Sequence, residues 1–263
     1  PPPRARRLPT GDKIPGGAYP AQGEKRMRIG LFLGCIASEW FAETHRATIR
    51  VLQANGCEVV VPTAQTCCGA LHRHAGILDE SDALFARSRD AFKDQEIDVI
   101  VVNAAGCGAA LKEPPHSAPD GLGIPVRDIC ELLDEIGIVP PPGRVEKKVV
   151  YDQPCHLLHG QGVGASAVEG LLAQIPGVEL LPLPNSDRCC GSGGVYNLVH
   201  PDLAEPIRDE KATEIRRVGP DVVVTGNPGC AMQIASGLEG SGIEVMHPID
   251  LLDRSYQASN PSV

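Results

Sequence analysis

The stretch Arg188-Cys-Cys-Gly-Ser-Gly-Gly-Val-Tyr196 places two adjacent cysteines at the start of a glycine-rich turn. A disulfide between neighbouring cysteines is strained, because its required geometry is hard to reach there. Two adjacent thiolates in a tight turn suit a soft metal centre instead. The pattern also occurs 122 residues earlier, as Cys67-Cys68-Gly69. We therefore expect the chain around both pairs to repeat as well.

The segments that flank the two cysteine pairs follow the same order. Strands are expected over 28–33, 58–61 and 97–102, and again over 148–151, 177–181 and 221–224. Helices are expected over 38–55, 79–95, 129–136, 164–175 and 202–218. Alternating strands and helices predict parallel sheets with right-handed crossovers. The prediction is an α/β protein with two pseudo-symmetric Rossmann-like lobes, from an internal repeat of about 120 residues.

Proline and glycine mark the expected boundaries of the lobes. Residues 1–26 are rich in both and are expected to form a linker without a core of its own. The first lobe is expected over 27–143, where Pro140-Pro-Pro142-Gly143 closes it, and the second over 144–263. In the helix expected over 38–55, one side carries apolar and small residues: Trp40, Thr44, Ala47, Val51 and Leu52.

Composition narrows the possible partners and compartment. The formal net charge of −9 argues against nucleic acid and anionic membrane as main partners. No apolar run is long enough to span a bilayer. Ten cysteines without a recognisable export signal favour a reducing compartment. We expect a cytoplasmic location, or a peripheral one on the cytoplasmic face of the inner membrane reached through partners.

Eight of the ten cysteines recur at matching places in the two halves. The candidate ligands are Cys155, Cys189, Cys190 and Cys230, followed by Cys35, Cys67, Cys68 and Cys107. The first set is preferred because its flanks are richer in glycine. All eight follow expected strands, and ligands of open α/β sheets bind beyond the carboxyl ends of strands. The sequence therefore predicts four thiols gathered at one sheet edge in each lobe.

The two remaining cysteines serve as an internal comparison. Cys57 aligns with Val178 in the other half, and Cys130 aligns with Ile249. Free cysteines often behave as small buried hydrophobes. We predict that role for both, outside any metal site.

Four thiolates fit either tetrahedral zinc or an iron–sulfur cluster. Structural zinc usually takes its ligands from short C-x2-C knuckles, whereas here they come from three distant glycine-rich loops. Glycine N–H groups can offset the negative charge of a thiolate-bound cluster, and the candidates are Gly69, Gly191, Gly193 and Gly194. This favours an iron–sulfur cluster, most simply 4Fe–4S, in one lobe or both. Zinc stays open as the alternative.

Three histidines stand beside the cysteines but outside the repeated set. They are His72, His74 and His156, whose counterparts in the repeat are Gly194, Tyr196 and Ile36. We therefore expect them to be hydrogen-bond donors or proton carriers near the cofactor rather than ligands. No Ser/His/Asp arrangement stands out, and no catalytic residue is assigned.

Several stretches together resemble a known family, the cysteine-rich (CCG) domains of heterodisulfide reductases, glycolate oxidase iron–sulfur subunits and lactate-utilisation proteins. The stretches are Cys67-Cys-Gly-Ala-Leu-His72, Asn103-Ala-Ala-Gly-Cys107, Cys155-His156, Cys189-Cys-Gly-Ser192 and Gly226-Asn-Pro-Gly-Cys230. The resemblance is closest to the glycolate oxidase iron–sulfur subunit and covers about residues 27–254.

The resemblance implies an electron-transfer subunit of a flavin-dependent 2-hydroxy acid dehydrogenase acting on glycolate or D-lactate. The flavin belongs to a partner flavoprotein, and electrons pass towards a quinone. Members of this branch usually carry an N-terminal ferredoxin-like domain with two C-x2-C-x2-C-x3-C-P runs. This chain has none, which is expected of a fragment or of a split subunit that needs a ferredoxin-like partner.

A second departure concerns the last position of each cysteine motif. The disulfide-reductase branch ends each motif in C-x-x-C and uses five cysteines for a non-cubane cluster. Ala110 and Gln233 occupy that position here. This weighs against the first alternative function, a thiol–disulfide reductase. The second alternative is a zinc-stabilised interaction module.

Overall fold

The computed structural model describes residues 13–258, which form two lobes. The first lobe contains β1 (Gly17–Tyr19), β2 (Met27–Phe32), α1 (Ile36–Trp40), α2 (Ala42–Ala54), β3 (Cys57–Val61), α3 (Ala70–His74), α4 (Leu78–Phe92), β4 (Val99–Val102), α5 (Ala105–Lys112), β5 (Val126–Asp128) and α6 (Ile129–Ile136). The second contains β6 (Lys147–Tyr151), the π-helix η1 (His156–Gly160), α7 (Ala165–Leu172), β7 (Val178–Leu180), α8 (Tyr196–Val199), α9 (Pro201–Val218), β8 (Val222–Val224), α10 (Pro228–Gly237), β9 (Glu244–Met246) and α11 (Pro248–Ala258).

Each lobe is built on one sheet, and the two sheets have equivalent strand orders. The first sheet runs β1-β3-β2-β4-β5 and the second runs β7-β6-β8-β9. Apart from β1, every strand pair is parallel, with Ile29 beside both Val59 and Val99, and Val149 beside Val222. If β1 is left out, the strands of the two sheets have the same spatial order. In each lobe, the second strand of the chain lies at one edge, followed by the first, the third and the fourth. The α/β class and the two Rossmann-like lobes are confirmed.

Local sequence explains why these segments adopt these structures. All four residues of β4 are buried apolar residues, as expected of a strand covered by helices on both faces. Helix α6 begins with a capping box. The Asp128 carboxylate accepts from the Cys130 N–H at 2.8 Å, and the Glu131 carboxylate accepts from the Asp128 N–H at 3.0 Å.

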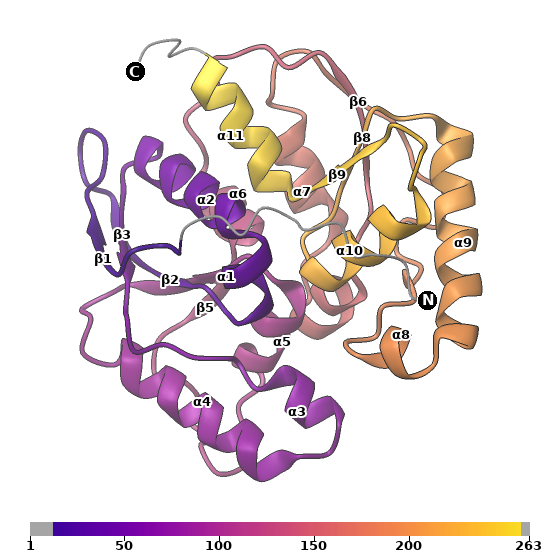
Figure 1. Ribbon diagram of the computed structural model, residues 1–263. Coiled ribbons are helices and arrows are strands. Elements are labelled where there is room, and N and C mark those ends of the chain that lie inside the picture. Colours follow the sequence, from indigo (N-terminus) through magenta and orange to yellow (C-terminus); the bar gives the residue numbers. More distant parts are fainter. Residues whose placement is uncertain (1–12, 259–263) are drawn as a thin grey trace.

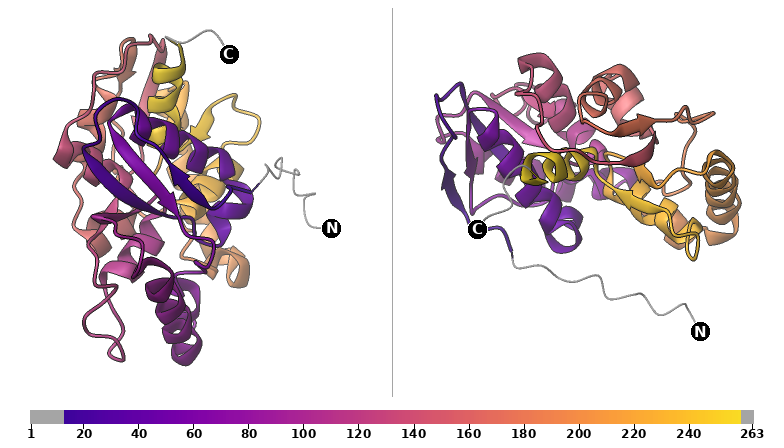
Figure 2. Two further views of the ribbon diagram at one scale, coloured as in Figure 1. Left: turned by 90° about the vertical axis from the view of Figure 1, so that its left-hand side faces the viewer. Right: turned by 90° about the horizontal axis from the view of Figure 1, so that it is seen from above.

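The two lobes share a single hydrophobic core. Its buried residues come from both sheets and from α2, α6, α7 and α11. Helix α11 of the second lobe lies beside α2 of the first (Figure 1), and Arg50 on α2 pairs with Asp253 on α11 at 2.7 Å. Figure 2 shows the two lobes side by side with α11 between their sheets. The outer face of each sheet has a smaller core of its own. The lobes are therefore packed as one unit.

Two sequence-based expectations need correction. Within the expected linker 1–26, β1 pairs antiparallel with β3, and Ile14 is buried in the shared core, so this part of the segment packs on the first lobe. Residues 1–12 of that linker lie outside the described part. The helix expected over 38–55 is divided at Phe41, and Trp40 is 48% exposed rather than packed on the buried side.

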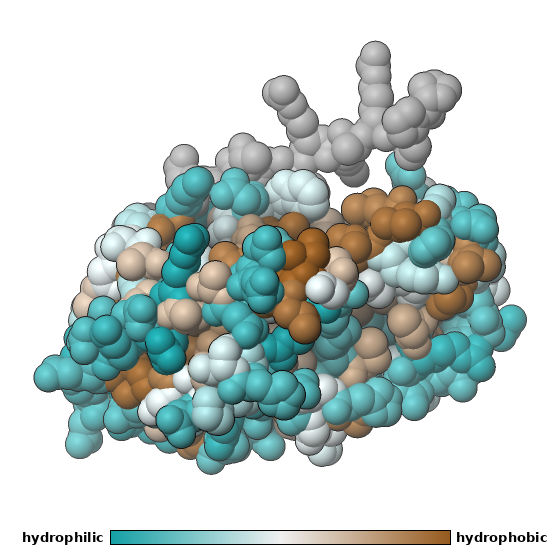
Figure 3. Space-filling view, turned by 90° about the horizontal axis from the view of Figure 1, so that it is seen from below, coloured by the Kyte–Doolittle hydropathy of each residue, from teal (hydrophilic) through white to brown (hydrophobic). Residues whose placement is uncertain are grey.

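The surface mixes polar and apolar side chains. The face that lies below in Figure 1, where α3, α4 and α8 are found, carries apolar areas among polar ones (Figure 3). On α8 and the start of α9, Leu198, Val199 and Leu203 are 77%, 63% and 54% exposed. Within residues 13–258, no helix has the length and apolar character needed to cross a membrane.

Candidate metal centres

The eight repeated cysteines lie at the carboxyl edges of the two sheets. Cys35 follows β2 and Cys107 lies in the first turn of α5 after β4; these strands are neighbours in the first sheet. Cys155 and Cys230 occupy the same places after β6 and β8 in the second sheet. These neighbouring strands flank the point where strand order reverses, which is where ligands bind in open α/β sheets. The fold therefore brings these cysteines to the site that its topology favours.

In the first lobe the four thiols lie as two contacting pairs. The sulfur of Cys67 is 3.4 Å from that of Cys35, and the sulfur of Cys68 is 3.1 Å from that of Cys107. Hydrogen bonding between these thiols raises the pKa of Cys35 and of Cys68, and burial raises both further. We refer to these four side chains as the first thiol site.

In the second lobe, Cys155, Cys189, Cys190 and Cys230 form the second thiol site. The thiol of Cys189 interacts with those of Cys155 and Cys190, and the thiol of Cys190 also interacts with that of Cys230. The neighbouring thiols of Cys155 and Cys190 hold the pKa of Cys189 well below the usual range, whereas the pKa values of Cys155 and Cys190 are raised. Thiolates this close repel one another, so complete deprotonation requires a cationic centre among them.

Two glycines predicted from the sequence donate backbone N–H groups to sulfur. Gly69 donates to Cys67 at 3.4 Å, and Gly191 donates to Cys189 at 3.4 Å. Both adopt left-handed backbone conformations, with φ of 80° and 87°. A Cβ on either residue would lie within 2.8 Å of neighbouring backbone. The turn after each cysteine pair therefore needs glycine both for its φ and for its close packing.

The two thiol sites adjoin across the lobe boundary. The rings of His74 and His156 lie with their centroids 5.4 Å apart, one from each lobe. His156 Nδ1 is also 3.7 Å from the sulfur of Cys155. A Cβ on Gly194 would lie 3.1 Å from Leu71 and 3.4 Å from His74 Nδ1. The loop after the second cysteine pair thus packs on the helix after the first.

The structure also places His72, Gly193 and the two cysteines outside the repeated set. Nδ1 of His72 is buried without a hydrogen-bond partner. Gly193 has φ of 52° and packs close to the side chain of Tyr196. Cys57 and Cys130 are 0% and 3% exposed and lie in the shared hydrophobic core, so their predicted burial is confirmed.

Sequence reasoning missed the side chains that link the lobes beside the thiols. Gln161 donates to the Ala105 carbonyl at 3.0 Å, and Asn227 contacts both Cys230 and the backbone of Gly106. These contacts join segments far apart in the chain. The only local signal was an asparagine three residues before a ligand candidate, in Asn227-Pro-Gly-Cys230.

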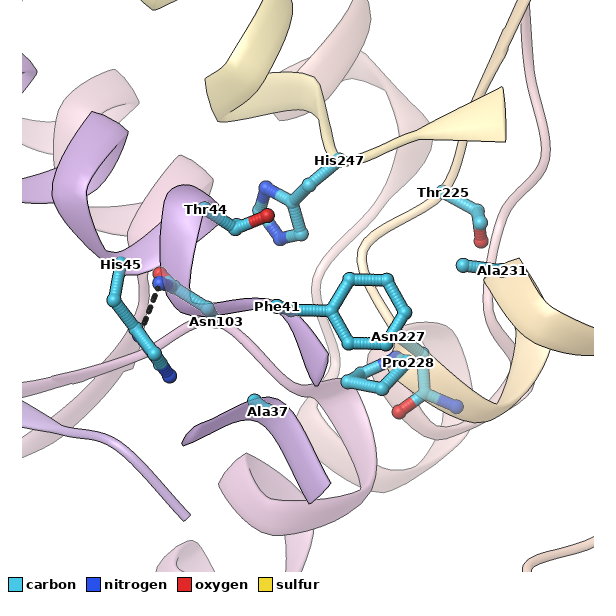
Figure 4. Close-up of a pocket in the computed structure, with 10 residues that line it drawn as sticks. All are labelled: Ala37, Phe41, Thr44, His45, Asn103, Thr225, Asn227, Pro228, Ala231 and His247. Atoms are coloured by element: carbon cyan, nitrogen blue, oxygen red, sulfur yellow. Dashed lines mark hydrogen bonds between the residues drawn. The ribbon is translucent and has the colours of Figure 1, made fainter. Parts of the chain in front are cut away.

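A small cavity opens between the lobes beside these contacts. Figure 4 shows its lining, which includes His45, Asn103 and His247. His45 Nε2 donates to the Leu33 carbonyl at 3.0 Å and Nδ1 accepts from Asn103 at 3.1 Å, so the ring is neutral. Burial lowers the pKa of His45 to about 4 and that of His247 to about 3. The lining therefore carries no charge near neutral pH.

The donor chemistry of both sites fits an iron–sulfur cluster. Each site offers four free thiols, and N–H donors from glycine reach one sulfur in each. Among residues 13–258, no three Cys, His, Asp or Glu side chains are arranged as ligands of one metal ion. In a cluster of several irons the thiolates bind different irons, so the sulfurs need not converge on one point.

Comparison with known proteins places these features in a family. The family model of the cysteine-rich domain (CCG) matches residues 29–112 and 149–235. The chain is 32% identical over 248 residues to a probable glycolate oxidase iron-sulfur subunit of Bacillus subtilis, covering 89% of this chain and 56% of that protein. It is 38% identical over 238 residues to a subunit of the fumarate reductase (CoM/CoB) of Methanothermobacter marburgensis, covering 87% of this chain and 46% of that protein.

A shorter relative matches along nearly its whole length. Lactate utilization protein A of Oceanobacillus iheyensis is 30% identical over 240 residues, covering 86% of this chain and 97% of that protein. The chain spans about half the length of the two longer relatives. Because both thiol sites fall within or beside the matched segments, the chain belongs to the cysteine-rich (CCG) domain family and holds two copies of its domain.

Proposed function

We propose that this protein is an iron–sulfur subunit of an oxidoreductase complex and that it transfers electrons. The observation that carries the proposal is the pair of adjoining sites, each with four thiols at the edge of a parallel sheet. Two of the relatives are named as an iron-sulfur subunit and a fumarate reductase subunit, which supports this class.

The residues have distinct roles in this proposal. Cys35, Cys67, Cys68 and Cys107 would hold one 4Fe–4S centre, and the second thiol site would hold another. When bound, such a centre supplies one-electron redox chemistry. Gly69 and Gly191 direct N–H groups at sulfur and so stabilise the negative charge of thiolate ligands. The contacts between the sites favour electron passage from one to the other within a single chain.

The finer proposal concerns the partners. A flavoprotein that oxidises a 2-hydroxy acid, such as glycolate or D-lactate, would supply the electrons, and a quinone would be their eventual acceptor. A ferredoxin-like subunit or domain would take part in the relay. The relatives named for glycolate oxidase and lactate utilization support this substrate class. The apolar side chains of α8 and α9, close in the chain to the second cysteine pair, support a role beside a partner.

Iron and acid-labile sulfide analysis, with electron paramagnetic resonance (EPR), tests the cofactor on protein purified without oxygen. We expect iron and sulfide in nearly equal amounts. Cys190→Ser removes the second-site signal and leaves the first, whereas Cys68→Ser does the reverse. Cys57→Val is the matched control, since it changes a buried thiol to the residue found at the equivalent position. Zinc without sulfide, or unchanged iron in both serine variants, would contradict the assignment.

Stopped-flow mixing tests the relay. Protein reduced with dithionite and freed of the excess is mixed with a water-soluble quinone, and we expect the reduced signal to disappear. The same reduced protein mixed with a small disulfide tests the reductase alternative. Ala110 and Gln233 supply no fifth thiol, and Gln233 is bonded to Asn197 at 2.9 Å, so we expect no disulfide turnover. Turnover of the disulfide but not of the quinone would favour the alternative.

A further inference from the structure

Asn227 lies at the junction of the two thiol sites. It immediately precedes α10 and has an extended backbone, with φ of −146° and ψ of 124°. Asparagine at this position usually accepts a hydrogen bond from an N–H in the first turn of its own helix. Here the side chain makes no such cap. Figure 4 shows it at the wall of the cavity between the lobes.

Both ends of the Asn227 amide are engaged. Its Oδ1 accepts from the backbone N–H of Gly106 at 3.3 Å, and its Nδ2 donates to the sulfur of Cys230 at 3.3 Å. A backbone N–H can only donate, so the oxygen must face Gly106 and the NH₂ group must face the sulfur. The orientation of the amide is thus determined by its two partners.

These two bonds connect one thiol site to the other. Gly106 precedes Cys107 of the first site, whereas Cys230 belongs to the second. A backbone bond runs beside them, from the Ala105 N–H to the Gly226 carbonyl at 3.0 Å. The loops after β4 and β8 are therefore tied together, and the amide of Asn227 is the side-chain part of that link.

The first half of the chain has no equivalent of the Asn227 side chain, although its fold repeats that of the second half. In the aligned loops, Ala104 stands where the other half has Asn227. A methyl group cannot donate a hydrogen bond, so Cys107 receives none from that position. Donors to cluster sulfur stabilise the extra negative charge of the reduced state and raise its reduction potential. The two sites thus differ in a property that determines which centre holds the electron.

We propose that Asn227 is a positioning residue that links the two centres and raises the reduction potential of the second above that of the first. This rests on the proposed function, because it assumes an iron–sulfur centre in each site. The electron would then reside preferentially at the second centre. No covalent bond changes in this role; the amide stabilises the charge that the incoming electron adds.

A redox titration followed by EPR tests the proposal. Asn227→Ala removes both bonds, and Asn227→Asp keeps an acceptor for Gly106 but turns a carboxylate oxygen towards the sulfur. At a fixed potential, we expect the ratio of reduced to oxidised second centre to fall about tenfold in Asn227→Ala, which is about 59 mV for one electron. This ratio falls further in Asn227→Asp, because a carboxylate oxygen then faces the sulfur. The potential of the first centre stays unchanged, and Cys68→Ser and Cys190→Ser identify the two signals.

The control is Gln174→Ala, which removes a side chain bonded to the Gly170 carbonyl of α7 and leaves both potentials unchanged. A shift of less than twofold in Asn227→Ala, or an equal shift of both centres, would overturn the tuning role.

Hydrogen exchange of the Gly106 amide is the second readout, and it does not depend on the metal. On the protein as purified, exchange is faster in Asn227→Ala and stays slow in Asn227→Asp. Unchanged exchange in Asn227→Ala would overturn the link itself. If no iron–sulfur centre forms, the proposed function fails and the tuning role fails with it, while the exchange result still decides whether the amide bond exists. The two failures are thus distinguishable.

Discussion

Asp128 combines a structural role with an unfavourable environment. Its carboxylate caps α6 through the Cys130 N–H, but it is 1% exposed and one of its oxygens has no hydrogen-bond partner. Desolvation, with a smaller contribution from the charge of Glu131, raises the pKa of Asp128 to about 7, although the hydrogen bond from the Cys130 N–H and the charge of Lys112 oppose the shift. A carboxyl group with a raised pKa in the folded state stabilises the protein below its unfolded pKa and loses that contribution as pH rises.

Asp128→Asn isolates this effect, because the amide keeps an oxygen for the cap and never ionises. Relative to wild type, the variant gains stability as pH rises from 5 to 7, by at most about 1.4 kcal/mol per pH unit, and the gain levels off above pH 7. Urea unfolding followed by circular dichroism measures the difference at each pH. Asp134→Asn changes an exposed carboxylate of the same helix and serves as the control. A pH-independent difference would show that Asp128 is already ionised at pH 5.

At the scale of elements, the sequence predicts most strands because they are short runs of buried apolar residues. The same signal, repeated in both halves, predicts the equivalent sheets. It does not predict β1, whose three residues are ordered by pairing with β3 rather than by a pattern of their own. Nor does it reveal the break at Phe41, because helical spacing continues through it. Tertiary contacts decide such short elements.

Helix α5 and η1 pack closely, and glycine makes this possible. A Cβ on Gly160 would lie 2.8 Å from the Cβ of Ala109 on α5. Real Cβ atoms do not approach so closely, so Gly160→Ala must displace one element from the other. Overpacking of this kind typically costs about 1–3 kcal/mol. Because α5 carries Cys107 and η1 follows Cys155, the displacement acts on the boundary between the thiol sites.

We therefore expect Gly160→Ala to lower the free energy of unfolding by about 1–3 kcal/mol, measured by urea denaturation. Gly170→Ala is the matched control: it lies inside α7, with no atom within 4 Å of the added methyl. Alanine there raises stability by about 0.5–1 kcal/mol, because glycine weakens a helix interior. Ala109→Gly added to Gly160→Ala recovers part of the loss. A neutral Gly160→Ala would mean that the two elements are not in close contact.

For the whole molecule, the repeat predicts two lobes and the places of their cysteines, but not how the lobes meet. Cysteine spacing identifies the eight thiols at the sheet edges, and their assignment as ligands stays a prediction. The bonds from Asn227 to Gly106 and from Arg50 to Asp253 join residues far apart in the chain. No single segment carries a signal for such contacts, because they arise only when the lobes pack together.

The shared core predicts that the lobes unfold together. Leu252 lies on α11 of the second lobe, is 3% exposed, and belongs to the core that also contains β2, β3 and β4 of the first. Leu252→Ala removes buried methyl groups and leaves a cavity, which typically costs about 2–5 kcal/mol. If the lobes form one cooperative unit, this loss reaches strands of both sheets.

Native-state hydrogen exchange measures the loss strand by strand. We expect the opening free energies of β4 and β8 to fall by the same amount in Leu252→Ala. The reverse test is Phe85→Leu, which alters the outer core of the first lobe, where Phe85 is 1% exposed. This variant too should lower the opening free energies of β4 and β8 by equal amounts. A fall confined to the mutated lobe would show two independent folding units, and the relative position of the two thiol sites would then not be fixed by the shared core.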